Sequence, residues 1–268
     1  GGTPSTGTTA AITSTFNTVG NYTITLKAYK SGNVSTATKS IRVKALPTVN
    51  ALTGTLTVCV GSTTTLSSTT PGGTWLSSNT SVATVLNGVV TGVSAGTANI
   101  YYSVTTSGCT KAVAATVTVT ALPTVSPITG TTSVCVGSTT SLSNPSSAGT
   151  WSSSNTSVAT VLNGVVTGVS AGTATIFYAI TTNGCTKTVS VTVTVNPLPT
   201  VNAITGTLSV CVGSTTTLNS TTPGGTWSSS NTSVATVLNG VITGVSAGTA
   251  NIYYSVTTNG CTKAVAAT

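Results

Sequence analysis

The sequence repeats itself at one fixed interval, and this period limits the possible folds more than any other feature. Three tryptophans mark it: Trp75, Trp151 and Trp227. Leu-Pro pairs keep the same period at Leu46, Leu122 and Leu198. Such periodicity is typical of chains built from tandem units that fold alike. We therefore predict repeat 1 at residues 46–121, repeat 2 at 122–197 and repeat 3 at 198–268, with residues 1–45 as a different, partial unit.

The three copies are not equally similar. Repeats 1 and 3 differ at six of 71 aligned positions, whereas repeats 1 and 2 differ at twenty, which indicates duplication of a two-repeat unit. Repeat 3 stops at the position that matches Thr116 and has no counterpart of residues 117–119. We therefore expect its last strand to be truncated and the sequence to be a segment of a longer protein.

Each repeat alternates short β-forming runs with turn residues. In repeat 1, apolar and polar residues alternate along 97–105, which is typical of a strand with one buried face. Asn87-Gly88 lies between two apolar runs and predicts a tight hairpin. Strands are expected at 57–60, 63–67, 74–77, 82–86, 89–93, 97–105 and 111–119. Short strands at this spacing predict an all-β fold, with tandem immunoglobulin-like β-sandwiches arranged as an elongated array.

The composition excludes whole classes of function. The 268 residues include no Asp, Glu or His. General acid–base catalysis draws mostly on these residues, calcium needs carboxylates, and zinc usually needs His or several close Cys. We therefore expect no enzyme activity, no metal and no cofactor. No apolar run is long enough to cross a bilayer, so we expect no membrane insertion by this segment.

The net charge of +8 does not predict nucleic-acid binding. Five of the eight positive residues lie between positions 27 and 44, and each repeat carries a single lysine: Lys111, Lys187 and Lys263. One charge per repeat cannot follow a phosphate backbone, where many contacts are needed. A weak attraction to anionic polysaccharide and a solubilising role at a strand edge both remain open.

One aromatic residue per repeat is expected to point away from the core. Tyr101, Phe177 and Tyr253 occupy the same position and alternate with inward-facing neighbours. Together with the three lysines they form a possible contact surface for glycans or for another subunit. Ordinary, partly covered sheet residues are the alternative interpretation. The tryptophans are expected to fill the cores.

Several segments of each repeat resemble the bacterial immunoglobulin-like group 2 (BIG2) family of adhesins and large surface proteins. In repeat 1 they are VCVGSTTTL at 58–66, SNTSVATV at 78–85, NGVVTGV at 87–93 and AGTA at 95–98. The Cys-containing form is similar to that of surface proteins of the Bacteroidetes type, which implies export by the type IX system. Residues 16–26 and 38–43 resemble the C-terminal half of a PKD-type β-sandwich.

The resemblance implies an extracellular, oxidising setting, in which the cysteines are expected to pair. Each repeat holds two at the same interval: Cys59 and Cys109, Cys135 and Cys185, Cys211 and Cys261. We expect these pairs to form one bridge inside each repeat. Bridges between neighbouring repeats, such as Cys59–Cys185, are an alternative that leaves Cys109 unpaired; free thiols are another.

These features lead us to expect a structural or adhesive protein of the bacterial surface, forming a stalk, fibre or filament. Its expected partners are further copies of itself and extracellular glycans. A carbohydrate-binding array and the stalk of a larger secreted enzyme are the alternatives.

Overall fold

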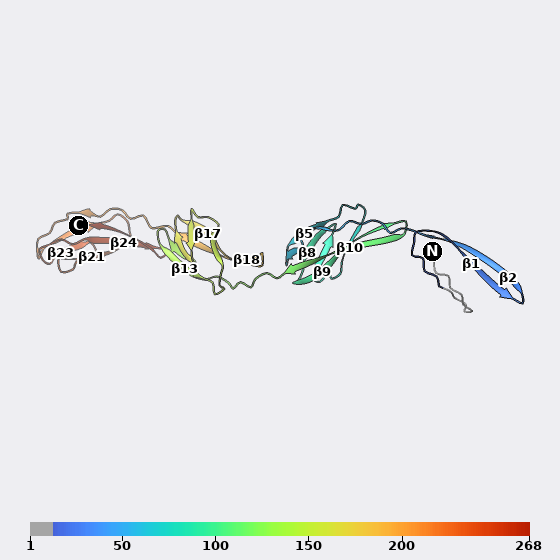
Figure 1. Cartoon of the computed structure of the whole chain (residues 1–268). Helices are drawn as coiled ribbons and strands as arrows, with labels where there is room; N and C mark the ends of the chain where they lie inside the picture. Colours follow the sequence, from blue (N-terminus) through green and yellow to red (C-terminus); the bar gives the residue numbers. More distant parts are fainter. Residues whose placement is uncertain (1–12) are drawn as a thin grey trace. The chain divides into compact units, whose positions relative to one another are not determined.

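A computed structural model describes residues 13–268 of the chain (Figure 1). The described residues form strands and turns without any helix, as the sequence predicts. They divide into two compact units: the part up to Leu122 together with Asn183–Cys185, and the remainder from Pro123 onward. Residues 1–12 of the predicted PKD-like unit lie outside the described residues.

The first unit holds an N-terminal hairpin and repeat 1. The hairpin strands are β1 (Gly20–Lys30) and β2 (Asn33–Val43). The strands of repeat 1 are β3 (Thr53–Gly54), β4 (Thr57–Cys59), β5 (Thr63–Ser67), β6 (Thr74–Ser77), β7 (Ala83–Leu86), β8 (Val89–Gly92), β9 (Gly96–Thr106) and β10 (Cys109–Thr120). All seven strands predicted in repeat 1 are confirmed, two of them with exact bounds, and the short strand β3 was not predicted.

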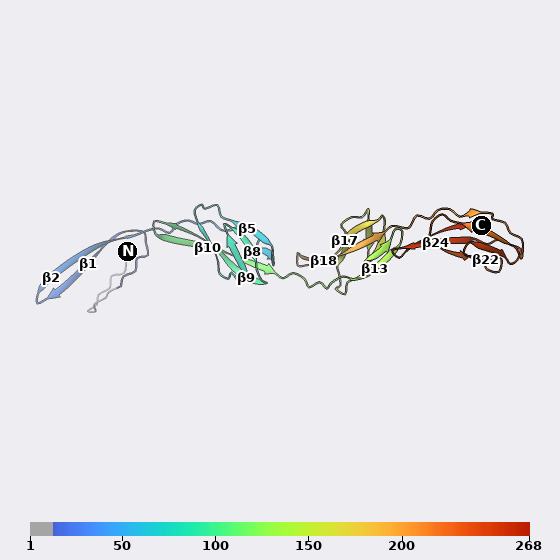
Figure 2. The same cartoon turned by 180° about the vertical axis from the view of Figure 1, so that it is seen from behind.

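Repeat 1 is a sandwich of two four-stranded sheets, β4-β10-β9-β6 and β3-β5-β8-β7 (Figure 1 and Figure 2). β9 and β10 pair antiparallel, and β4 joins the far edge of β10 in parallel. The inward face of β9 is buried as its alternation predicts. The core between the sheets is apolar: Val58, Leu66, Ala83, Val90, Ala98, Ile100, Val117 and Val119.

The second unit holds most of repeat 2 and all of repeat 3. The strands of repeat 2 are β11 (Thr129–Gly130), β12 (Ser133–Cys135), β13 (Thr139–Ser143), β14 (Thr150–Ser153), β15 (Ala159–Leu162), β16 (Val165–Gly168), β17 (Gly172–Thr182) and β18 (Cys185–Asn196). Those of repeat 3 are β19 (Thr205–Gly206), β20 (Thr215–Asn219), β21 (Thr226–Ser229), β22 (Ala235–Leu238), β23 (Val241–Gly244), β24 (Ile252–Thr258) and β25 (Cys261–Ala267). Repeat 2 has the same two four-stranded sheets as repeat 1.

The Asn87-Gly88 turn connects β7 and β8, as predicted. Both residues have positive φ, 50° and 85°, which a two-residue turn of type I′ requires. A Cβ on Gly88 would lie 2.4 Å from the carbonyl oxygen of Leu66, so glycine is needed there for space as well as for conformation.

Each tryptophan packs against the core beside a buried tyrosine. The rings of Trp75 and Tyr102 have their centroids 4.8 Å apart. The Tyr102 hydroxyl donates to the carbonyl oxygen of Thr70 at 2.6 Å and accepts from the amide of Gly73 at 2.8 Å. A Cβ on Gly73 would lie 2.3 Å from the tyrosine ring. The tyrosine thereby fixes the loop before β6 through two hydrogen bonds and a close backbone contact.

The N-terminal hairpin repeats the last hairpin of the sandwiches. β1 and β2 pair Gly20 with Val43, and β9 and β10 pair Gly96 with Val119, each residue shifted by one repeat period. The turns match as well, because Ser31 and Ser107 share positive φ values of 49° and 53°. Unlike β9 and β10, β1 and β2 have no second sheet against them among the described residues, and most of their side chains are exposed.

Repeat 3 has a smaller core than repeats 1 and 2. Only Leu218, Ile242 and Ile252 form its buried cluster. Its β21-β24-β25 sheet has three strands, and residues 209–211, which match β4, do not form a strand. In repeat 1, β4 pairs with Thr118–Thr120 at the end of β10. The counterparts of these residues in repeat 3 lie beyond Thr268, so residues 209–211 pair with no strand among the described residues.

Candidate functional site: the disulfide junctions between repeats

The predicted bridge inside each repeat is wrong in this structure, because β10 separates the two cysteines. Cys59 is paired in register with Thr120 at one end of β10, and Cys109 is the first residue at the other end. A strand of 12 residues spans roughly 36 Å at about 3.3 Å per residue. Disulfides need Cα atoms within about 7 Å of each other. Cys59 and Cys109 therefore cannot pair while the sandwich is folded.

The bridges instead join neighbouring repeats. Cys59 of repeat 1 pairs with Cys185 of repeat 2, and Cys135 of repeat 2 pairs with Cys261 of repeat 3. In both, the Cα atoms are 5.6 Å apart and the cysteines are 126 residues apart in the sequence. This is the alternative that the sequence left open. One cysteine of each bridge comes from an early edge strand, and the other follows the hairpin turn of the next repeat.

The hairpin-turn cysteines are enclosed at these junctions. Cys185 and Cys261 are 2% and 0% exposed. The Cys185 sulfur lies 3.9 Å from the carbonyl oxygen of Thr120, the last residue of β10. The Cys261 sulfur lies at the same distance from the carbonyl oxygen of Asn196, the last residue of β18. Each bridge therefore lies where the final strand of one repeat ends and the next repeat begins.

A polar side chain supports two of the connections between successive parts of the chain. Asn196 donates from Nδ2 to the carbonyl oxygen of Asn259 at 3.4 Å and to Ser133 Oγ at 2.9 Å. Lys44, which lies two repeat periods before Asn196, donates from Nζ to the carbonyl oxygen of Ser107 at 2.5 Å. Ser107 matches Asn259 by the same shift. The connection between the N-terminal hairpin and repeat 1 is therefore built like that between repeats 2 and 3, but without a disulfide.

The two bridges change how the backbone is connected. They join Cys59 to Cys185 and Cys135 to Cys261. Each bridge is one junction, and three stretches of backbone between residues 59 and 261 connect the two junctions. The outer paths, 59–135 and 185–261, are equal in length, and the middle path, 135–185, is shorter. Tension applied to the ends of the chain is shared among these paths, and the shortest of them limits the extension.

Two cysteines are unpaired among the described residues: Cys109, which is half-buried, and Cys211, which is exposed. Cys109 occupies the hairpin-turn position of Cys185 and Cys261, and Cys211 occupies the edge-strand position of Cys59 and Cys135. They therefore occupy the two positions that form bridges elsewhere in the chain, one in repeat 1 and one in repeat 3.

The predicted contact surface is not a single face. Tyr101 and Tyr253 are half-buried and alternate with the buried Tyr102 and Tyr254, as predicted. Lys111, however, pairs in register with the buried Val104, so it lies on the opposite face of the sheet from Tyr101. Lys263 pairs with Val256 in the same way. In repeat 2, Phe177 is half-buried and Lys187 is exposed.

Each repeat has an exposed leucine that was not predicted from the sequence. Leu86, Leu162 and Leu238, just before the Asn-Gly turns, are 73–74% exposed. The nearby Val89, Val165 and Val241 are 41–44% exposed, which gives each repeat a small apolar patch at the same hairpin. The alternation along β7 already places Leu86 on the outer face, so the pattern contained this signal.

The described residues contain no group of three or more His, Cys, Asp or Glu that could hold a metal ion. Over the same residues, no helix is long and apolar enough to span a membrane.

Comparison with known proteins gives low similarity. No protein-family model matches the sequence, and no curated protein matches it. Among solved structures, domains 4 and 5 of the S-layer protein SbsC are 22% identical, with 55% of this chain and 98% of that chain covered and a TM-score of 0.24. BT4661, a SusE-like surface-located polysaccharide-binding protein of Bacteroides thetaiotaomicron, is 13% identical, with 93% of this chain and 51% of that chain covered and a TM-score of 0.31. The ICAM-5 D1–D4 ectodomain fragment is 13% identical, with 92% of this chain and 82% of that chain covered and a TM-score of 0.34. Likenesses at this level give no information on function.

Proposed function

We propose that this chain is a structural segment of an extracellular bacterial protein, in which tandem immunoglobulin-like sandwiches carry tension between the ends of a surface stalk or fibre. The observation that carries the proposal is the pair of disulfides joining each repeat to the next. Disulfides persist in oxidising compartments outside the cytosol. Bridges that cross between repeats limit the extension of the chain and also keep neighbouring repeats covalently joined.

The junctions support this role in a second way. Each bridge lies beside the last residue of the final strand, where the chain leaves one repeat for the next. The edge strand β4 is short, and its three pairs with β10 are the ladder contacts that hold it. A covalent link at Cys59 fixes this short strand where peeling under tension would begin.

The composition supports a passive role for the chain. With no Asp, Glu or His, the chain offers none of the usual general acids and bases. We therefore propose that any catalytic activity of the parent protein belongs to other domains. The motif resemblance of 58–66, 78–85 and 87–93 supports a relationship to BIG2 repeats of surface adhesins, and export by the type IX system is part of the same proposal.

A carbohydrate-binding array is less well supported by the geometry. The outward tyrosines and the lysines lie on opposite faces of the sheets in repeats 1 and 3. A sugar in contact with one of them does not meet the other on the same face. Binding to a glycan panel tests this alternative directly.

Surface exposure and thiol state test the proposal in cells. We expect antibodies against repeat 2 to label intact cells, and a membrane-impermeant protease to remove the label. We also expect Cys59, Cys135, Cys185 and Cys261 to resist alkylation until a reductant is added. A chain found inside the cell with all six cysteines alkylated contradicts the proposed function.

A further inference from the structure

The two cysteines of repeat 2 pair with the most distant cysteines that this sequence offers them. Cys135 bonds Cys261, and Cys185 bonds Cys59, each across 126 residues. All other cysteines in the sequence are nearer to Cys135 than Cys261 is, and the same holds for Cys185 and its partner Cys59. Cys135 and Cys185 themselves are only 50 residues apart. The observed bridges are therefore not the ones that proximity along the chain favours.

In an unfolded chain, the separation of two cysteines along the sequence decides how often they meet. The entropic cost of closing a flexible loop rises with the logarithm of the loop length. By this relation, Cys135 meets Cys185 about four times as often as it meets Cys261. Oxidation before folding is therefore expected to close the loop 135–185 in preference to either observed bridge.

A bridge inside repeat 2 is incompatible with the folded sandwich of that repeat. Cys185 is the first residue of β18, and Cys135 pairs in register with Asn196, the last residue of the same strand. The 12 residues of β18 span roughly 36 Å, whereas disulfide-bonded cysteines have Cα atoms within about 7 Å of each other. A Cys135–Cys185 bridge therefore forces β18 out of its sheet. Val193 and Val195, which are 0% and 1% exposed, leave the core with it.

Folding brings Cys185 to its observed partner. In repeat 1, the pairing of β4 with β10 places Cys59 in register with Thr120. The carbonyl oxygen of Thr120 lies 3.9 Å from the Cys185 sulfur. The strand pairing inside repeat 1 therefore holds Cys59 at the junction, while β18 keeps Cys185 away from Cys135.

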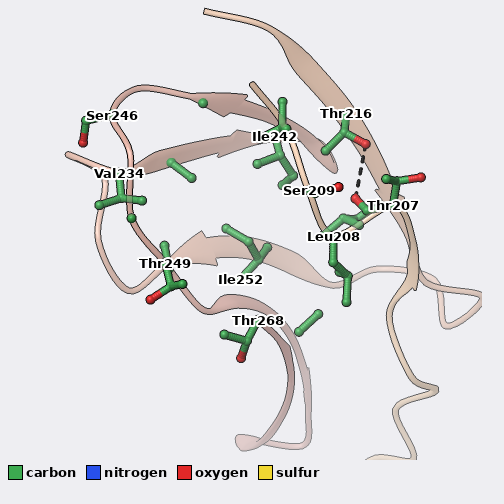
Figure 3. A pocket seen from close by; sticks show the side chains of 17 residues that line it. Thr207, Leu208, Ser209, Thr216, Val234, Ile242, Ser246, Thr249, Ile252 and Thr268 are labelled. Atoms are coloured by element: carbon green, nitrogen blue, oxygen red, sulfur yellow. Dashed lines mark hydrogen bonds between the residues drawn. The ribbon is translucent and has the colours of Figure 1, made fainter. Parts of the chain in front are cut away.

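Folding does the same for Cys261 in repeat 3. β25 begins at Cys261 and pairs with β24, whose Ile252 lies opposite Ile242 of the other sheet in the core (Figure 3). The Cys261 sulfur lies 3.9 Å from the carbonyl oxygen of Asn196, and Asn196 is in register with Cys135. Both bridges are therefore positioned by folded sandwiches, so folding has to come before oxidation.

Observed and incorrect bridges differ in their access to other thiols. Cys185 and Cys261 are 2% and 0% exposed at the folded junctions. Thiol–disulfide exchange needs a thiolate to reach one of the two bonded sulfurs. A chain closed at Cys135–Cys185 cannot fold repeat 2, so both of its bonded sulfurs stay accessible. Exchange therefore acts preferentially on the incorrect bridge.

We propose that this chain is a substrate of a thiol–disulfide isomerase, an enzyme with a reactive, exposed pair of thiols that reopens bridges formed before folding. Its target is the bridge Cys135–Cys185, and its action lets repeat 2 fold before the crossed bridges form. The inference rests on the proposed extracellular function only for the oxidising setting in which bridges form.

The exchange balances without a further oxidant for the first crossed bridge. An isomerase thiolate attacks the Cys135 sulfur, the electron pair of the broken S–S bond leaves on Cys185, and the proton of the isomerase thiol ends there. After folding, the thiolate of Cys261 attacks the Cys135 sulfur and releases the isomerase thiolate, which takes up the proton of Cys261. The bridge Cys59–Cys185 needs an oxidant, and a small disulfide such as oxidised glutathione serves, because it is reduced to two thiols.

A variant of the 268-residue chain with four cysteines tests this order of events. Cys109→Ser and Cys211→Ser together keep only the cysteines that form bridges, and four cysteines allow three pairings. The reduced variant is oxidised with diamide either in denaturant or after refolding in native buffer, and peptide mapping identifies the bridges. We expect crossed bridges in nearly all chains that refold first, and in only about a fifth of the chains oxidised in denaturant.

Recovery of the incorrectly bridged chain tests the isomerase. The variant oxidised in denaturant is transferred to native buffer with reduced and oxidised glutathione, with and without purified protein disulfide isomerase. We expect the isomerase to raise the rate at which crossed bridges appear by about tenfold or more. An isomerase with serine in place of its reactive cysteines is the control, and we expect it to leave the rate unchanged.

A core substitution tests whether the folded sandwich directs the pairing. Ile176 is 0% exposed in repeat 2, so Ile176→Asp buries a carboxylate and should leave this repeat unfolded. We expect incorrect bridges in this variant even when oxidation follows the transfer to native buffer. Thr173→Asp is the matched control, because Thr173 is exposed on the same strand β17, and we expect it to form crossed bridges.

Four results would overturn the proposal. Mostly crossed bridges after oxidation in denaturant, or in the Ile176→Asp variant, would show that pairing does not depend on folding. Incorrect bridges after refolding of the four-cysteine variant would contradict the order of events. Equal rates with and without the isomerase would refute the assignment of the partner. None of these results depends on where the protein is located, so they are distinct from a failure of the proposed function.

Discussion

The crossed disulfides predict how far the chain can be stretched, and one pair of variants separates this pairing from the alternative. With both bridges intact, the shortest covalent path from Cys59 to Cys261 runs only through residues 135–185. Without bridges the path is the whole segment 59–261. At roughly 3.5 Å per extended residue, these two paths extend to about 175 Å and about 700 Å.

Single substitutions give graded lengths. Cys185→Ser removes one bridge and leaves a path through 59–135, which is longer than the intact path by about 90 Å. Cys109→Ser removes a cysteine that forms no bridge, so the path should not change. Single-molecule pulling on handles at the two ends of the chain measures the unfolded contour length of each variant under non-reducing conditions.

Bridges inside each repeat predict a different result. Under that pairing the path of the intact chain runs through 109–135 and 185–211, which is about 180 Å and close to the crossed value. The unmodified chain alone therefore does not separate the two arrangements. Under that pairing, Cys109→Ser and Cys185→Ser would each remove one bridge. The backbone loop that the bridge had closed would then add its full length to the covalent path between Cys59 and Cys261. Equal lengthening by Cys109→Ser and Cys185→Ser, by about 175 Å each, would refute the reasoning.

Three further predictions concern the sandwiches and their chemistry. Tyr102→Phe should lower the free energy of unfolding of repeat 1 by about 1–3 kcal/mol, because the amide of Gly73 and the carbonyl of Thr70 lose their shared partner. Tyr101→Phe is the control, and an equal loss of unfolding free energy for both variants in a denaturant titration would contradict this account. Gly73→Ala should destabilise repeat 1 by about 1–3 kcal/mol, since its Cβ would overlap the Tyr102 ring, and an unchanged thermal midpoint would argue against the packing described. Calcium and chelators should leave the melting temperature unchanged, because the chain has no carboxylate side chains to bind the ion; a rise of many degrees with calcium would show that backbone and amide oxygens suffice.

The strands could be predicted from the sequence because their signals are local. β5 and β6 begin and end at the predicted residues, since turn residues bound both runs. The Asn87-Gly88 turn follows from the positive φ that both positions need. The inward alternation of β9 likewise depends only on neighbouring residues.

The disulfide pairing could not be predicted because it depends on strand register. Nothing in the spacing of Cys59 and Cys109 shows that β4 pairs with the far end of β10. Once that register is known, roughly 36 Å of strand separates the two cysteines, and pairing inside the repeat is excluded. The match between the N-terminal hairpin and β9–β10 was hidden for a similar reason, because it appears in the register and the turn more clearly than in residue identities.

Tryptic peptide mapping without reduction tests the crossed pairing most directly. Cleavage after Lys44, Lys111, Lys187 and Lys263 yields peptides 45–111, 112–187 and 188–263, each with both cysteines of one repeat. After alkylation of free thiols and digestion of the unfolded chain, crossed bridges predict one species of all three peptides, with alkyl groups on Cys109 and Cys211. Three separate peptides, each closed by its own internal disulfide, would contradict the account.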